Sequence, residues 1–161
     1  MNWLLVKRGL VQLSRFGLAA LFLFTAGAKL LIVQAFVANV GELLSASGFD
    51  YARWTWPATI AVISAEIITA LLLILPRTVR VGAVSAAGLL IGFAVYALYY
   101  VYILHGEPLE CGCFGGIIAS QLGVKTALRN LALLVPVIIV LLGYTRSKRS
   151  EAPPLPEPLT T

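Results

Sequence analysis

Charged residues are scarce in this chain. Only 12% of its 161 residues are charged, whereas 60% are hydrophobic, and the mean hydropathy is +0.93. In a soluble globular domain, roughly a quarter of the residues are charged and about half are apolar. So few charges cannot cover the surface of a soluble protein of this size, which excludes a soluble fold. The lipid bilayer must therefore form part of the environment.

Acidic residues are scarcer than basic ones, seven against twelve, which gives a formal net charge of +5. A basic excess can indicate nucleic-acid binding, but here the basic residues lie at the ends of apolar segments. This placement is typical of membrane topology and not of a groove that follows phosphates. We therefore exclude nucleic acid as a partner.

Long apolar runs divide the chain into predicted membrane spans. Each run is close to the roughly 20 residues that a helix needs to cross a bilayer, and backbone groups in lipid must be satisfied within the helix. The predicted fold is an all-α integral membrane protein, a bundle of four transmembrane helices. The spans cover about residues 11–37, 57–75, 81–104 and 126–144.

The four spans form one predicted membrane domain, residues 11–145. Residues 1–10 are a short segment before it, and residues 146–161 are a flexible tail that is first basic and then proline-rich. A short amphipathic helix in the membrane interface is also predicted, because apolar residues recur there at helical spacing. These residues are Phe36, Val37, Val40, Leu43 and Leu44.

The flanking charges predict the orientation of the spans. Basic residues gather before the first span, between the second and third, and after the fourth, while the other two connections are mainly acidic. The positive-inside rule then places both termini in the cytoplasm of a bacterial cell, with a multi-pass chain in the inner membrane. The basic residues are Lys7, Arg8, Arg15, Arg77, Arg80, Arg146, Lys148 and Arg149.

Only two cysteines are present, Cys111 and Cys113, and Gly112 alone separates them. In the predicted orientation they face the oxidising side, where such a pair suggests a disulfide or a redox pair. A bridge between them would close a small, strained ring that glycine permits, and strain makes a disulfide easier to reduce. This favours a bond that cycles. The alternative is an inert bridge that locks a turn.

The chain has a single histidine, His105, close to the cysteines. Together with Cys111 and Cys113 it could hold a soft ion such as Cu(I) or zinc. A fourth ligand is not apparent, so metal binding ranks below redox exchange and no metal site is predicted.

Ionisable residues inside the predicted spans form a second group of candidates. Lys29 lies in the first span and Glu66 at the middle of the second, while Arg129 and Asn130 lie about one turn into the fourth. Charges in hydrocarbon usually face the bundle interior and pair. The four residues could form one polar cluster. It would be either a structural ion-pair network or a proton path or quinone headgroup site coupled to thiol chemistry.

Several of these residues belong to short sequence motifs that resemble those of known membrane protein families. Arg15-Phe16-Gly17, then Ala26-Gly27-Ala28-Lys29-Leu30 and Glu66, resembles the first half of DoxX-like membrane proteins. Cys111-Gly112-Cys113-Phe114-Gly115 after a tyrosine-rich third span, followed by Arg129-Asn130, resembles the methylamine-utilisation family MauE. The resemblance covers about residues 15–143. It implies that the recurrent residues are Lys29, Glu66, Cys111, Cys113, Phe114, Gly115, Arg129 and Asn130.

The resemblance to MauE implies a role in maturing a periplasmic redox enzyme such as methylamine dehydrogenase, together with a thioredoxin-like periplasmic partner. The chain lacks a Cys-x-x-Cys motif and any second cysteine pair, so a partner must supply the other thiols. Whether the chain is itself a thiol–disulfide oxidoreductase component stays open, and quinone is the one cofactor considered. The alternatives are a non-catalytic subunit or assembly scaffold of a membrane complex, and a protein that handles copper or a small solute.

Overall fold

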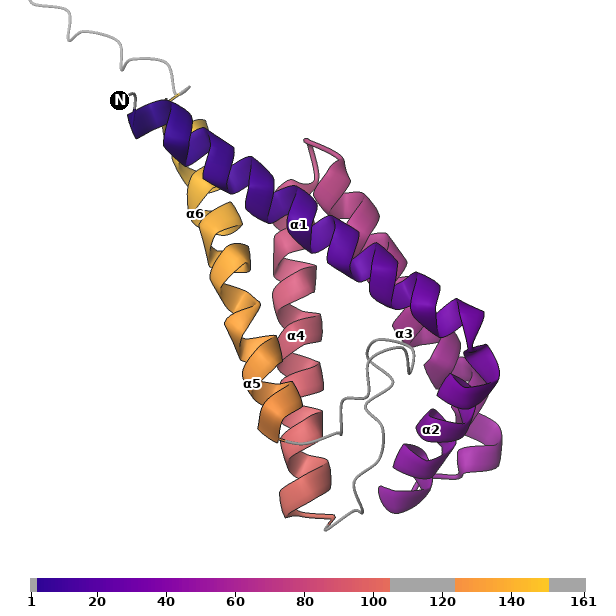
Figure 1. Cartoon of the computed structure of the whole chain (residues 1–161). Coiled ribbons are helices and arrows are strands. Elements are labelled where there is room, and N and C mark those ends of the chain that lie inside the picture. Colours follow the sequence, from indigo (N-terminus) through magenta and orange to yellow (C-terminus); the bar gives the residue numbers. More distant parts are fainter. Residues whose placement is uncertain (1–2, 105–123, 151–161) are drawn as a thin grey trace, which may run out of the picture.

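The computed structural model describes residues 3–104 and 124–150, and the regular structure in these ranges is helical (Figure 1). Four helical stretches are long and apolar enough to cross a membrane: Val6–Leu31, Tyr51–Ile74, Val79–Tyr102 and Val124–Tyr144. This confirms the predicted all-α bundle of four transmembrane helices. The helices are α1 (Trp3–Leu31), α2 (Val33–Ala46), α3 (Tyr51–Ile74), α4 (Val79–Tyr102), α5 (Val124–Ala132) and α6 (Leu134–Ser150).

The first apolar run bends at a single residue. Ile32, with φ −121° and ψ 40°, leaves the helical region and separates α1 from α2. The bend keeps the local hydrogen bonding, because the Ile32 amide still donates to the Ala28 carbonyl at 3.3 Å. Residues 33–37, expected as a weak continuation of the first span, therefore belong to α2. This helix is the predicted short amphipathic one, and it packs on α3 with Phe36 buried.

The second span begins earlier than its apolar run. The Asp50 side chain accepts a hydrogen bond from the Arg53 amide at 3.4 Å and starts α3 at Tyr51, ahead of the expected start at Pro57. Acidic caps stabilise helix starts because they satisfy amides that have no partner within the helix. Pro57 is accommodated inside α3 although it has no amide hydrogen to donate.

The fourth span is divided in two at Leu133. Pro136 follows this break, and a proline inside a helix can neither donate to the carbonyl four residues earlier nor avoid its oxygen. That carbonyl is Ala132, the last residue of α5. Pro136 therefore accounts for the division of this span into α5 and α6.

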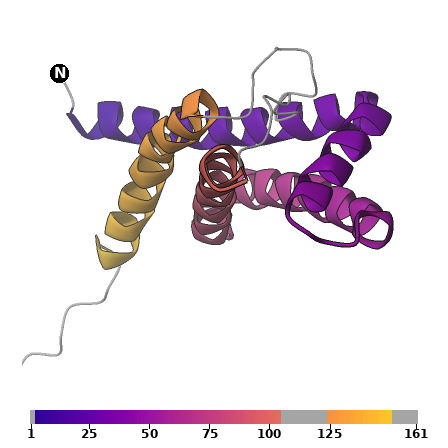
Figure 2. The ribbon, with the colours of Figure 1, turned by 90° about the horizontal axis from the view of Figure 1, so that it is seen from below.

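Neighbouring helices pack as a bundle with α1 along one side. α1 packs on α3 and α6, and α4 packs on α3, α5 and α6. Figure 2 shows α3, α4 and most of α6 to one side of α1. The backbones of α3 and α4 approach closely, because a Cβ at Gly82 would lie 2.7 Å from the Leu73 amide nitrogen. Only glycine fits at this position.

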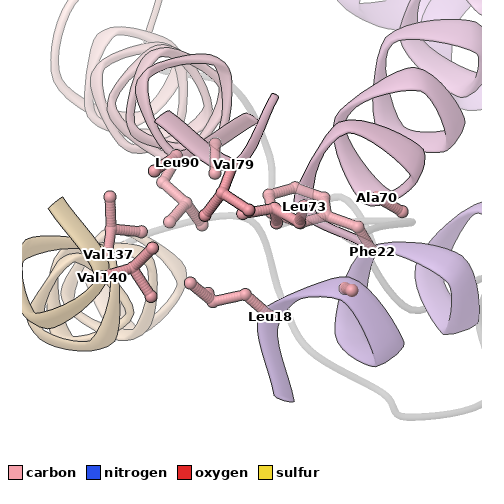
Figure 3. Packing of buried hydrophobic residues seen from close by; sticks show 11 residues of the cluster. Leu18, Phe22, Ala70, Leu73, Val79, Leu90, Val137 and Val140 are labelled. Carbon is pink, nitrogen blue, oxygen red and sulfur yellow. The ribbon is translucent and has the colours of Figure 1, made fainter. Parts of the chain in front are cut away.

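An apolar core fills one half of the bundle (Figure 3). It joins the three transmembrane helices α1, α3 and α4 to α6, and its largest members are fully buried. We call this half the Arg15 end, because Arg15 and the turn between α3 and α4 close it. The other half, formed by α2, the first turns of α3 and the last turns of α4, is the α2 end. The core consists of Leu18, Ala19, Phe22, Ala70, Leu73, Val79, Ala83, Ala86, Leu90, Val137 and Val140.

Candidate functional site

The structure brings together two of the ionisable residues that the sequence singled out. The Lys29 ammonium of α1 donates to Oε1 of Glu66 on α3, at 2.5 Å. The two side chains are only 3% and 2% exposed. They form a buried ion pair between two membrane helices.

Aromatic rings from two further helices surround the ammonium group. Nζ of Lys29 lies 5.4 Å from the ring centroid of Phe36 on α2 and 5.8 Å from that of Phe93 on α4. A cation within about 6 Å of a ring face is attracted to it, more strongly where water is excluded. Four helices, α1 to α4, therefore contribute to the position of this one charge.

The carboxylate of Glu66 keeps hydrogen-bonding capacity. Among the described residues, its second oxygen, Oε2, has no hydrogen-bond partner, and neither has Oγ1 of Thr59, which is 0% exposed. Thr25 of α1 places its hydroxyl beside the same carboxylate. Buried polar atoms in folded proteins almost always have a partner, so each exception requires an explanation.

The pair can serve either structure or chemistry. Removing one partner of a buried pair leaves an uncompensated charge, whereas apolar replacement of both is often tolerated. Placing an ionisable pair inside a membrane costs free energy, and such residues commonly mark a functional site. Chemically, a carboxylate with one free oxygen beside an ammonium group can take up and release a proton.

The other two members of the predicted cluster lie on α5. Asn130 is buried and Arg129 is partly exposed, and α5 packs on α4. The described contacts of Lys29 and Glu66 come from α1 to α4. A single cluster of all four residues stays a prediction.

The thiol site lies outside the described residues. This applies to both candidate catalytic cysteines, to the residues of their motif and to the histidine of the alternative metal site. Within residues 3–104 and 124–150, no group of three or more His, Cys, Asp or Glu side chains could hold a metal ion. The residues outside are His105, Cys111, Gly112, Cys113, Phe114 and Gly115.

Sequence reasoning missed the role of Arg15, which it treated as a flanking charge. The side chain is 5% exposed, and Nε donates to the Leu73 carbonyl at 2.5 Å while Nη2 donates to that of Ile74. Nη1 donates to the Tyr144 hydroxyl of α6 at 2.8 Å. Arg15 therefore binds the free carbonyls at the end of α3. A signal was present, because this charge lies inside the first predicted span.

The aromatic neighbours of Lys29 were also missed as site residues. Phe36 was assigned only to an amphipathic helix, and Phe93 is one of many apolar residues in the third span. Their approach to the ammonium depends on the bend at Ile32 and on the packing of α4, which no local pattern reports.

A comparison of the sequence with known protein families gives a match that covers most of the chain. The family model described as "Methylamine utilisation protein MauE" matches residues 7–143. No curated protein and no solved structure matches the chain, and the likeness to DoxX-like proteins stays a prediction. The match includes the four apolar helical stretches, except the first residue of the first and the last residue of the fourth, and the segment with both cysteines. The chain is thus a multi-pass membrane protein that belongs to the MauE family, a family of methylamine utilisation.

Proposed function

We propose that this protein is a thiol–disulfide maturation factor of the bacterial inner membrane. It exchanges disulfides through Cys111 and Cys113 with a thioredoxin-like periplasmic protein, and so supports the biogenesis of a periplasmic redox enzyme such as methylamine dehydrogenase. The termini lie in the cytoplasm and the cysteines face the periplasm.

The observation that carries the proposal is the place of the cysteines in the chain. They are the only two thiols, they are separated by one glycine, and they fall between the membrane helices α4 and α5. A pair in a connection outside the bilayer is accessible to a soluble partner. The family match supports the same function, because it covers this connection.

The exchange needs no cofactor on this chain. In the reduced protein, the thiolate of one cysteine attacks the disulfide of the partner, and one partner sulfur leaves as a thiolate. The second cysteine then attacks the mixed disulfide and releases the other partner sulfur. The protein ends with a Cys111–Cys113 disulfide, and two electrons have passed to the partner, which becomes a dithiol.

A trapping experiment tests this function. Variants Cys111→Ser and Cys113→Ser are each expressed in cells that contain the partner and its client enzyme. We expect one of them to accumulate a covalent complex on a non-reducing gel, which dithiothreitol dissolves. The variant that retains the attacking cysteine should give the complex, because the resolving cysteine is missing.

The double variant Cys111→Ser, Cys113→Ser is the matched control and should form no complex. Full maturation of the client enzyme by this double variant would eliminate the redox function. The protein would then act as an assembly scaffold.

A further inference from the structure

The buried face of α3 is unusually polar for a membrane helix. Of its seven buried residues, four are polar: Thr55, Thr59, Glu66 and Thr69. We call these four the α3 polar face. The buried face of the adjacent helix α4 provides the contrast, because its members are Val, Gly, Ala, Leu and one Tyr. The polarity is therefore a feature of α3 and not of the bundle in general.

The α3 polar face begins at one end of the bundle only. Thr55 lies one turn inside the α2 end, and Glu66 lies about 16 Å further along the helix at 1.5 Å per residue. Beyond Thr69, the buried residues of α3 are Ala70 and Leu73, which belong to the apolar core of the Arg15 end. Towards the α2 end, Thr59 and Ile63 are the buried residues of α3 between Thr55 and Glu66, and Ile63 packs in a small apolar cluster with Ala26 and Phe36. Two threonines and one isoleucine thus separate Glu66 from the α2 end, whereas only apolar side chains follow Thr69 in the other direction.

The hydroxyls on the two sides of Glu66 differ in their bonding. Thr69 is paired with Ser85 of α4 at 2.6 Å. Thr55 donates to the Tyr51 carbonyl of its own helix at 2.5 Å, the usual arrangement for threonine in a membrane helix. Thr59 has neither kind of bond among the described residues, although it is fully buried. The groups with unused hydrogen-bonding capacity, Oγ1 of Thr59 and Oε2 of Glu66, therefore both belong to the α3 polar face, and Thr59 lies on the α2-end side of Glu66.

We propose that the α3 polar face is a water and proton access route that connects Glu66 with the α2 end and not with the Arg15 end. Thr59 and Glu66 are two helical turns apart, about 10 Å, so their free oxygens cannot bond directly. Connecting them takes a chain of buried waters that passes Ile63, because the two hydrogen bonds of one water span only about 5–6 Å. Such waters would supply the hydrogen bonds that the two oxygens lack. The route ends at the carboxylate.

The Glu66 carboxylate, at the end of the route, has Lys29 as a charged neighbour. Among the described residues, Lys29 of α1 is the charged group in contact with Glu66, and the Thr25 hydroxyl of α1 lies beside the same carboxylate. The rings of Phe36 from α2 and Phe93 from α4 lie against the Lys29 ammonium. When Glu66 accepts a proton from a hydronium ion, which becomes water, its carboxylate becomes a neutral acid and the ion pair loses its negative member. When it returns the proton to water, the pair forms again. This inference does not depend on the thiol chemistry proposed above.

Cysteine accessibility tests the direction of the route. In a background with Cys111→Ser and Cys113→Ser, which has no other thiol, single cysteines replace Thr59 or Leu73. Phe49→Cys in the turn before α3 and Arg77→Cys in the turn after it mark the two membrane sides, because both positions are exposed. A small, membrane-impermeant methanethiosulfonate is then added to either side of reconstituted vesicles.

We expect Thr59→Cys to react from the same side as Phe49→Cys, and Leu73→Cys to react from neither side. The proposal is overturned if Thr59→Cys is inert while Phe49→Cys reacts, or if it reacts from the side of Arg77→Cys. Full labelling by a permeant maleimide in detergent confirms that each thiol is present.

Infrared spectroscopy of the protein with its native cysteines gives a second, independent readout. A pH step should change a carboxyl stretching band that shifts in D2O and is absent in Glu66→Gln. Thr59→Val, which removes only the hydroxyl, should slow this change, whereas Thr69→Val, on the far side of Glu66, should not. Equal rates in the two valine variants, or no pH-dependent band in the unmodified protein, would refute the route.

Discussion

The guanidinium of Arg15 holds the end of α3, with Nε 2.5 Å from the carbonyl oxygen of Leu73. The last carbonyls of a helix have no partner within the helix and carry its partial negative charge, so a buried cation is well placed there. Because Arg15 also donates to the Tyr144 hydroxyl, one side chain of α1 connects the end of α3 to α6.

Replacement of Arg15 should therefore destabilise the bundle. We expect Arg15→Met to lower the free energy of unfolding by about 3 kcal/mol, since hydrogen bonds to charged groups contribute about 1.5–3 kcal/mol and the carbonyls are left unpaired. Arg15→Lys should recover only part of this, because an ammonium lacks the planar fork. Unfolding in mixed micelles measures the change. Arg8→Met, at an exposed position of the same helix, is the control and should have little effect.

The buried pair makes a prediction about coupling. Lys29→Met or Glu66→Leu alone should each cost about 3–5 kcal/mol of unfolding free energy, because each strands the opposite charge. The double variant should be clearly more stable than the worse single variant. A double-mutant cycle in the same micelle assay measures the coupling. Additive losses would show that the two side chains do not interact.

Two glycines of α4 should respond in opposite ways to the same change. Gly82→Ala should destabilise the protein, because its Cβ would lie 2.8 Å from the Leu72 carbonyl carbon and 2.7 Å from the Leu73 nitrogen. Gly88→Ala meets nothing within 4 Å and should stabilise the helix by about 0.5–1 kcal/mol. Thermal unfolding of the two variants checks this. A stabilising Gly82→Ala would contradict the close packing of α3 on α4.

The predicted orientation can be tested with the native thiols. An impermeant maleimide added to intact spheroplasts should label the reduced protein at Cys111 and Cys113, because the basic flanks predict cytoplasmic termini and hence an external position of the cysteines. The double serine variant controls for other proteins of similar size. Labelling only after the membrane is broken open would reverse the orientation.

Hydropathy predicted the four spans because burial in lipid depends on composition and length, which are local properties. It placed the start of the second span at Pro57 because Tyr51 and Trp54 are less apolar, whereas the helix starts where Asp50 caps it. The pairing of Lys29 with Glu66 could be anticipated from the cost of lone charges in lipid. Their aromatic neighbours could not, because those contacts depend on how the helices cross.

The bend at Ile32 has a mechanical consequence. Lys29 and Phe36 stand on opposite arms of this bend, and the ammonium lies 5.4 Å from the ring. The attraction between them therefore helps the packing of α2 on α3 to hold the angle between α1 and α2. Helix α2 continues for ten residues beyond Phe36 to Ala46. A loss of charge at Lys29 would remove this attraction and so allow α2 to rotate about the bend at Ile32. The displacement would be largest at the far end of α2, where the Tyr96 hydroxyl of α4 bonds to the Leu43 carbonyl.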